Sequence, residues 1–485
     1  MVFSSHLFLF YFLPLVLVLY YAAPRRTRHL LLTLLSYLFY GWANPAFVVL
    51  MFSSTVIDYI CGLAMTRQFG AAWKEPVQPL PQNGRRTRGQ KAALFISICA
   101  NLSLLGFFKY FNFATANYDA LLSALGLADQ RLDIWYRITL PLGISFYTFQ
   151  SMSYSIDVYR GDARAIRNFT DFSCYVAMFP QLVAGPIIRF QEVAEQLRTR
   201  THTMAKFSRG ITFLCLGLGK KVLLANPCGK IADTAFNAGA ATCADAWYGV
   251  TAYAFQIYFD FSGYSDMAIG LGLMLGFVFA KNFDSPYLSE SITDVWRRWH
   301  LSLSNWLRDY LYIPLGGNRG SKSRTYLNLM AVMLLGGLWH GASWNFAIWG
   351  GMHGTMLAFE RAQGRNSPYR ALPRPVRIAF TFAILLFTWV FFRARDLSHA
   401  LGYCGTMLGR GTGSATAGLV GGVVHRPYYQ LSFLIAALVI WGAPQTWDFT
   451  RRITWSKVAW VFLVFLLAIV ALTTQSFNPF IYFIF

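Results

Sequence analysis

The chain alternates long apolar runs with short connections that are rich in arginine and lysine. Three windows, 7–23, 92–108 and 138–156, contain no charged side chain, and each is long enough to cross the hydrocarbon core of a membrane as a helix. The runs are continuous and rich in Leu, Phe, Val and Ala, whereas the strands of a membrane β-barrel would alternate apolar and polar residues. The pattern therefore predicts an all-α fold, a polytopic bundle of transmembrane helices.

The apolar runs predict about 11 membrane spans together with a re-entrant segment. The run 326–359 has basic residues beyond both ends, which predicts a helical hairpin that returns to the same face of the membrane. The run 244–280 is interrupted by a polar sequence at 259–266, which predicts a broken helix. The remaining spans are predicted at 7–23, 30–43, 46–65, 92–110, 138–158, 378–392, 431–446 and 458–473.

Charge in the connections predicts the topology. The basic connections 25–28, 67–91 and 160–167 are assigned to the cytoplasm by the positive-inside rule, which puts both chain termini outside. The apolar segment 172–188 is flanked by basic residues on both sides and contains two prolines. It is predicted either as a re-entrant loop that lines a cavity, because irregular backbone at membrane depth must be covered, or equally as a kinked ordinary helix.

Composition excludes an ordinary soluble enzyme. Only 13% of the residues are charged and 55% are hydrophobic, whereas a soluble domain carries about 25% charged residues. The net charge of +21 lies in short loops beside the membrane, so we predict no nucleic-acid partner. The seven cysteines form no Cys-x-x-Cys pair, so neither a disulfide framework nor a bound metal is predicted.

Two carboxylates lie in apolar surroundings. Asp260 and Asp266 would each cost about 2.5–3.5 kcal/mol near the bilayer centre, so they are expected to face protein or water. Pairing with nearby arginines as structural ties is favoured over a direct part in catalysis. The following segment, 281–324, interleaves Trp and Tyr with Arg and Lys, which is typical of the headgroup level. The same basic surface would also attract an anionic substrate.

Three histidines are candidates for chemistry. His340 lies between glycines at the midpoint of the hairpin 326–359, His300 follows the basic sequence Trp-Arg-Arg-Trp, and His353 lies further along the hairpin. A neutral imidazole can take a proton from a hydroxyl and later return it. For His340 the functional and the structural interpretation carry equal weight. The motifs of serine hydrolases, ATPases and zinc peptidases are absent, which leaves a transferase or a transporter.

Five motifs occur together along the chain. They are Leu-Pro-Leu-Gly-Ile-Ser-Phe-Tyr at 140–147, Phe-Pro-Gln-Leu-Val-Ala-Gly-Pro at 179–186, Tyr-Phe-Asp-Phe-Ser-Gly-Tyr-Ser-Asp at 258–266, Trp-Arg-Arg-Trp-His at 296–300 and Trp-His-Gly at 339–341. This combination resembles the membrane-bound O-acyltransferase family, and most closely its bacterial alginate O-acetylation branch. The resemblance covers nearly the whole chain.

The resemblance implies one integral-membrane acyltransferase domain over 1–485, with a catalytic core at 140–360 and helices around a central tunnel. It implies that His340 is the general base and that His300 is the second catalytic position. Asp260, Asp266 and His353 are expected as structural or tunnel-lining polar groups. The candidates for binding the donor are Arg297, Arg298, Trp339 and Asn318.

The resemblance also implies a substrate class and partners. Acetyl-CoA or a similar acyl thioester is expected as the donor substrate, with no bound cofactor. The protein itself is expected in the bacterial inner membrane. A periplasmic serine-hydrolase-like acetyltransferase would complete transfer to an exopolysaccharide such as alginate or cellulose. The extracytoplasmic aromatic tail, 474–485, resembles a C-terminal motif of polysaccharide- and teichoic-acid-modifying members. Tyr482 is therefore a candidate acyl relay, and an interfacial anchor is the alternative.

Two other interpretations stay open. A proton-coupled membrane transporter would use the intramembrane histidines as a pathway, but the inverted repeats typical of that class are not found. A non-catalytic scaffold would recruit the periplasmic acetyltransferase and would tolerate replacement of His340.

Overall fold

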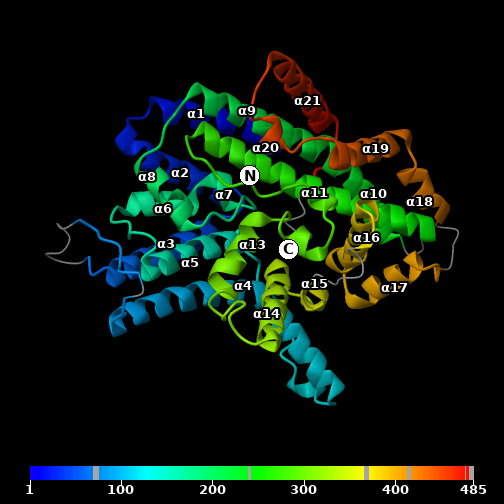
Figure 1. Cartoon of the computed structure of the whole chain (residues 1–485), viewed down its shortest axis with the longest axis horizontal. Coiled ribbons are helices and arrows are strands. Elements are labelled where there is room, and N and C mark those ends of the chain that lie inside the picture. Colours follow the sequence, from blue (N-terminus) through cyan, green and yellow to red (C-terminus); the bar gives the residue numbers. More distant parts are fainter. Residues whose placement is uncertain are drawn as a thin grey trace. The chain divides into compact units, whose positions relative to one another are not determined.

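The regular secondary structure of the described chain consists of helices (Figure 1). The structure, a computed structural model, describes residues 1–68, 76–82, 84–238, 242–364, 371–411, 417–475 and 477–479. No strand occurs in these ranges, so the predicted all-α fold class is confirmed. By its contacts the chain divides into two compact units, Met1–Thr203 with Leu275–Phe279, and Met204–Met274 with Ala280–Phe485. The predicted division into a core at 140–360 and a tail stays a prediction.

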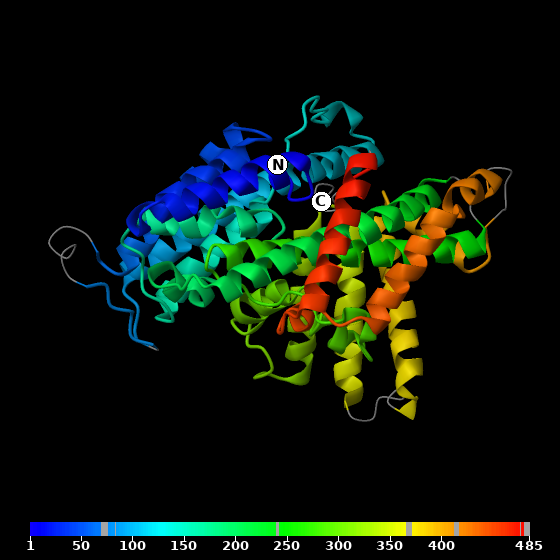
Figure 2. The same ribbon diagram turned by 90° about the horizontal axis from the view of Figure 1, so that it is seen from above.

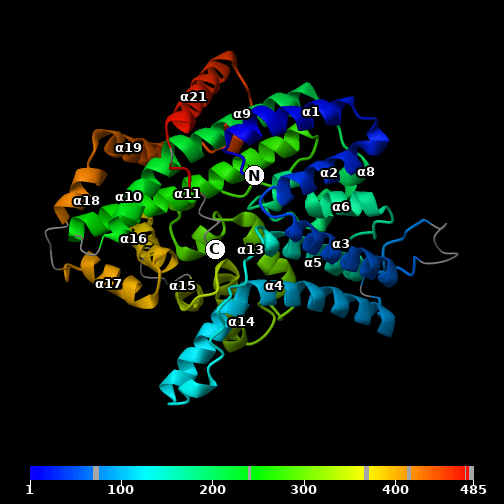
Figure 3. The same cartoon turned by 180° about the vertical axis from the view of Figure 1, so that it is seen from behind.

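The first unit is a bundle in which α3 packs against α4, α5 and α6, and α2 packs against α6 (Figure 3). Its helices are α1 Leu13–Ala22, α2 Arg28–Gly41, α3 Ala46–Met65, α4 Arg88–Ala124, α5 Ile144–Arg160, α6 Phe169–Ala177, α7 Phe179–Leu182 and α8 Phe190–Arg198, with a π-helical segment Leu7–Phe12 before α1 and short 3₁₀ turns at Arg25–Thr27 and Ala128–Gln130. The predicted spans between 7 and 158 each coincide largely with a helix, except that α5 begins only at Ile144 and leaves 138–143 outside it.

The segment 172–188 is interrupted, as its prolines and glycine predict. Helix α6 ends at Ala177, α7 is a single turn, and the chain has no helix again until α8 begins at Phe190. Pro180 and Pro186 each remove a backbone donor, and a Cβ on Gly185 would lie 2.5 Å from the Cα of Gln181. An ordinary kinked helix is therefore wrong, while re-entry into the membrane remains a prediction.

The second unit is built around two long neighbouring helical stretches, α9 and α11 (Figure 1). Helices α15 and α16 lie side by side (Figure 2), and α21 packs against α9. The helices are α9 Met204–Gly219, α10 Asn226–Asn237, α11 Cys243–Met274, α12 Ile292–Trp296, α13 Leu301–Leu307, α14 Lys322–His340, α15 Trp344–Gln363, α16 Arg374–Arg393, α17 Leu397–Met407, α18 Ala417–Val424, α19 Pro427–Gly442, α20 Thr446–Phe449 and α21 Trp455–Thr474, with π-helical turns at Lys220–Ala225 and Arg308–Tyr312 and a 3₁₀ turn at Pro286–Leu288.

Five helical stretches of the described chain are long and apolar enough to cross a membrane: Ala46–Met65, Arg88–Ala124, Met204–Asn237, Arg374–Arg393 and Trp455–Thr474. The stretch Met204–Asn237 is absent from the spans predicted from the sequence. Lys220, Lys221 and Pro227 interrupt its apolar pattern, and the charges of both lysines are balanced by aspartates of α11. The total of about 11 spans remains a prediction.

Helix α11 shows that the broken helix predicted within 244–280 is wrong. It continues unbroken from Cys243 to Met274, although a broken helix was predicted at 259–266. Glycines bring α9 and α11 into backbone contact, because a Cβ on Gly263 would lie 2.7 Å from the Gly217 carbonyl oxygen, and one on Gly270 would lie 2.5 Å from that of Gly210. Its carboxylates reach the lysines of the neighbouring stretch from this position, so they do not require a break.

Candidate active site

His340 stands at the end of a closely packed helical hairpin, which confirms the hairpin predicted at 326–359. Helix α14 ends at His340, and α15 returns from Trp344. A Cβ on Gly337 would lie 2.2 Å from the Phe346 carbonyl oxygen, and one on Gly350 would lie 2.3 Å from that of Met333. Only glycine allows the two backbones to approach this closely, so these positions fix where the imidazole lies.

Aromatic rings enclose the His340 imidazole. The ring centroids of Trp339, Trp349 and Phe392 lie 5.0, 5.4 and 5.2 Å from that of His340, and the residue is only 5% exposed. Such a wall of rings restricts the access of water to the imidazole.

His300 is held in one orientation by Asn282. Its Nδ1 lies 3.2 Å from Asn282 Oδ1, and this oxygen also accepts from the Ser302 backbone N–H at 3.2 Å and hydroxyl at 2.9 Å. The Asn282 amide nitrogen donates to the Ser265 hydroxyl at 2.8 Å. The network assigns the proton to Nδ1, so Nε2 of a neutral ring carries the lone pair. Nε2 is buried without a hydrogen-bond partner among the described residues.

The backbone of His300 also indicates that its surroundings hold the residue firmly. Its φ of +45° lies in the left-handed region, which is uncommon for a residue other than glycine. Strain of this kind persists where the surroundings hold a residue firmly and is frequent at functional sites.

His353 joins the same cluster from α15. Trp296 Nε1 donates to His353 Nδ1 at 3.3 Å, and the Trp349 ring lies 4.7 Å away. Its Nε2 therefore carries the proton in the neutral ring and is buried with no acceptor in the described part of the chain. The rings connect His300 through Trp339, at 6.2 Å, to His340, and His340 through Trp349 to His353. The structure thus brings the three candidate histidines together.

Asp260 and Asp266 are tied to lysines and not to arginines. Lys221 Nζ lies 2.7 Å from Asp260 Oδ1, and Lys220 Nζ lies 2.7 Å from Asp266 Oδ2. Thr446 also donates to Asp266 at 2.7 Å. The predicted role as paired groups is consistent with this geometry, but the predicted identity of the partners is wrong.

The donor-binding candidates do not gather at one place. Trp339 is part of the histidine cluster, whereas Arg297 and Asn318 are exposed, and Asn318 accepts a hydrogen bond from Tyr312 at 2.5 Å. Arg298 pairs with Asp294 at 3.0 Å. Tyr482 lies outside the described residues, so its role as a relay stays a prediction.

Several residues of the site gave no sequence signal. Asn282 lies in the irregular connection between α11 and α12, Phe392 belongs to an unremarkable apolar run, and Lys221 follows a second lysine inside a helix. None of them has a spacing or motif that indicates its partner, because the partner comes from a distant part of the chain.

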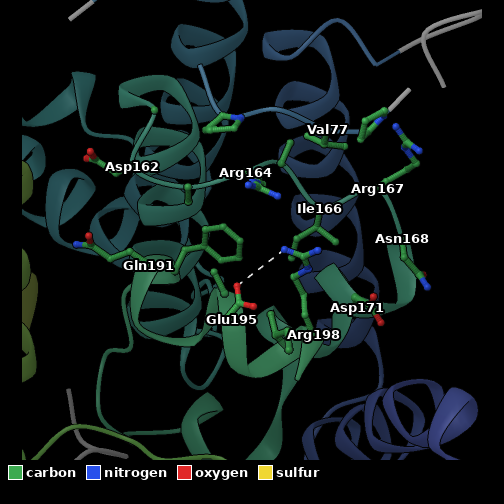
Figure 4. Close-up of a pocket in the computed structure, with 18 residues that line it drawn as sticks. Val77, Asp162, Arg164, Ile166, Arg167, Asn168, Asp171, Gln191, Glu195 and Arg198 are labelled. Carbon is green, nitrogen blue, oxygen red and sulfur yellow. Dashed lines mark ion pairs between the residues drawn. The ribbon is translucent and has the colours of Figure 1, made fainter. Parts of the chain in front are cut away.

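The first unit contains a separate cavity of about 830 Å³ that holds none of the predicted site residues (Figure 4). Arg164, Arg167 and Arg198 lie around it together with acidic side chains, and Arg198 lies 3.9 Å from Glu195. The mixture of charges balances the arginines locally, so the cavity does not define a ligand.

The comparisons with known proteins identify the family of the chain. Residues 96–394 match the membrane-bound O-acyltransferase family. The chain belongs to this family: it is a multi-pass membrane protein and an acyltransferase. The resemblance drawn from the five motifs is therefore confirmed.

Relatives of the chain carry more specific names. It is 44% identical over 503 residues, covering all of both chains, to the probable alginate O-acetylase AlgI of Pseudomonas putida strain KT2440. It is 50% identical over 400 residues to the protein of that name from Azotobacter vinelandii, covering 82% of this chain and 76% of the relative. It is 34% identical to a peptidoglycan O-acetyltransferase of Helicobacter pylori strain 26695, over 84% and 80% of the two chains.

Proposed function

We propose that the protein takes acetyl groups from an acyl thioester on the cytoplasmic side of the bacterial inner membrane and passes them across for O-acetylation of an exopolysaccharide. Alginate is the first polymer to test, because relatives of 44–50% identity are named alginate O-acetylases. A periplasmic acetyltransferase is the proposed partner that completes transfer to the polymer. Family membership favours this function over a transporter or a non-catalytic scaffold.

The observation that carries the proposal is the enclosed position of His340. A buried imidazole at the turn of a rigid hairpin, walled by three aromatic rings, suits a base that must meet a hydroxyl away from water. His340 takes the proton of the attacking hydroxyl, whose oxygen forms a bond to the thioester carbonyl carbon. The C–S bond then breaks, and the thiolate takes the proton back from the imidazolium.

We assign His300 a supporting part in the same step. Its Nε2 lone pair can accept a hydrogen bond from the substrate, because the Nδ1 proton is committed to Asn282. Exposed basic residues such as Arg297 are proposed to attract the phosphates of the donor, and Trp339 to contact the acyl group.

Reconstitution tests this function directly. The purified chain in proteoliposomes receives radiolabelled acetyl-CoA on one side, and release of free thiol and transfer of label to a protein or sugar hydroxyl are measured. We expect thiol release that depends on the chain. A chain that accumulates normally, supports polysaccharide acetylation in cells and yet never consumes a thioester would contradict the proposal and indicate a scaffold.

Asn282 provides a prediction about tautomer control. Asn282→Leu removes the acceptor of the His300 Nδ1 proton and leaves a similar side-chain volume. We expect about a tenfold fall in the rate of thiol release, because a ring that can rotate or switch its proton no longer presents Nε2. Asn282→Asp keeps the acceptor and should retain most of the rate, and equal losses in both variants would exclude the tautomer effect.

Tyr482 separates an acyl relay from a membrane anchor. Tyr482→Phe removes the hydroxyl and preserves the aromatic ring, so the relay predicts loss of polysaccharide acetyl ester with normal amounts of protein. An anchor predicts no change. Ester content of exopolysaccharide from cells that lack the native copy is the measurement.

A further inference from the structure

The described end of the chain, Phe477–Pro479, lies along α10 in a regular order. Lys230 places its ammonium 5.6 Å from the Phe477 ring centroid, and Asn226 donates from Nδ2 to Asn478 Oδ1 at 3.2 Å. Lys221, which precedes α10, donates from Nζ to the Pro479 carbonyl oxygen. Successive tail residues thus meet positions 230, 226 and 221, so the tail runs antiparallel to this stretch.

The segment is suited to lie extended. Proline at 479 disfavours a helical conformation at Asn478, and Pro479 has no N–H of its own and can only accept. Gln475, two residues before the segment, donates to the Tyr428 hydroxyl at 2.5 Å. The chain is therefore held at Gln475 and again at Phe477–Pro479 after α21 ends at Thr474.

The tail contacts Lys221 in the interior of the second unit and not at its surface. Lys221 is 2% exposed and Asp260 is 1% exposed. An ammonium has three N–H donors, and burial makes each unmet donor costly. After the pairing with Asp260 the Lys221 ammonium can serve further acceptors, and the Pro479 carbonyl is one of them. The tail backbone therefore completes the surroundings of a buried ion pair.

We propose that the Lys221–Asp260 pair and Asn226 form a docking site for the chain's own C-terminal segment Phe477–Pro479, and that they act as positioning residues for the end of the chain. The docking fixes the position of Phe477–Pro479 within the second unit. The effect of this docking on acetyl transfer rests on the proposed function. The docking itself does not depend on that function.

The neighbouring ion pair offers a matched control. Lys220 and Asp266 lie on the same two helical stretches and are separated by the same 2.7 Å. Asp266 takes its additional hydrogen bond from Thr446, and no contact between this pair and the described tail residues is found. A general loosening of the helices should affect both pairs, whereas loss of docking should follow only the Lys221 pair.

The test measures how well docking protects position 479 of the tail from a thiol-labelling reagent. Pro479→Cys keeps the backbone carbonyl and introduces a thiol, and the full-length protein is labelled with a maleimide in detergent. Labelling at position 479 is followed by mass spectrometry of the C-terminal peptide. The variants compared with the Pro479→Cys parent are Lys221→Met/Asp260→Leu, Asn226→Leu and the control Lys220→Met/Asp266→Leu. Replacing both partners avoids leaving an unpaired buried charge.

We expect labelling about tenfold faster in Lys221→Met/Asp260→Leu and in Asn226→Leu, and the parental rate in the control. Parental rates in both test variants would overturn the proposal, as would equal acceleration in the control. If the double variant does not accumulate, Asn226→Leu decides the outcome alone.

A second measurement connects docking to acetyl transfer. Exopolysaccharide ester content in cells carrying Asn226→Leu is expected to fall in parallel with the gain in labelling. If the wild-type chain consumes no thioester, the proposed function fails while the labelling result still decides whether the tail docks. Faster labelling with undiminished ester would overturn the positioning role.

Discussion

Replacing His340 by alanine is expected to reduce acetyl transfer about a thousandfold while the protein accumulates normally. The reason is that a positioned general base contributes about 10²- to 10⁴-fold to a rate, and no other imidazole occupies the turn of the hairpin. The measurement combines thiol release by the purified chain with the ester content of exopolysaccharide from cells lacking the native copy. Membrane fractionation verifies the amount of protein.

Two controls separate chemistry from packing. Added imidazole can enter the space that the truncated side chain vacates, so partial recovery of the rate would indicate that a proton acceptor, and not ring packing, was lost. His353→Ala removes the same side chain from the same aromatic cluster, but His353 has no assigned proton transfer. Equal losses in both variants without rescue by imidazole, or a wild-type rate in His340→Ala, would contradict the role of His340 as base.

The sequence predicted the elements with continuous apolar signals and missed those that depend on distant partners. The hairpin that carries His340 could be located because a single apolar run, 326–359, has basic residues beyond both of its ends. Helix α11 was predicted to break at 259–266 because polar residues in a membrane segment are costly when unpaired. The structure supplies partners from another helix, and the cost that would have broken the helix is removed.

The same reasoning explains why one candidate span was not predicted. The stretch Met204–Asn237 contains two adjacent lysines and a proline, which reduce its hydropathy in any local window. The pairing of Lys220 and Lys221 with Asp266 and Asp260 removes the cost of unpaired charges in apolar surroundings. Local patterns contain no information about such pairing, so the carboxylates were assigned arginine partners instead. The orientation of His300 by Asn282 was hidden for the same reason.

Replacing only the lysine of the Lys220–Asp266 ion pair is expected to destabilise the protein more than replacing both partners. Lys220→Met leaves the largely buried Asp266 carboxylate, whose side chain is 13% exposed, without its ammonium. Loss of one partner of a fully buried pair costs about 3–5 kcal/mol, which sets the upper limit for this variant. We expect markedly reduced accumulation in the membrane and a lowered midpoint of thermal unfolding in detergent. Lys220→Met/Asp266→Leu replaces both charges by apolar side chains and should restore most of the accumulation.

The comparison of the single and double variants decides what holds α9 and α11 together. Glycine contacts at 217–263 and 210–270 already bring the backbones together, so the ion pairs are required to neutralise charge and not to create the interface. A double variant as unstable as the single one would show that the pair itself supplies the net attraction between these helices. A stable single variant would contradict this prediction and show that the hydrogen bond from the Thr446 hydroxyl compensates for the missing ammonium.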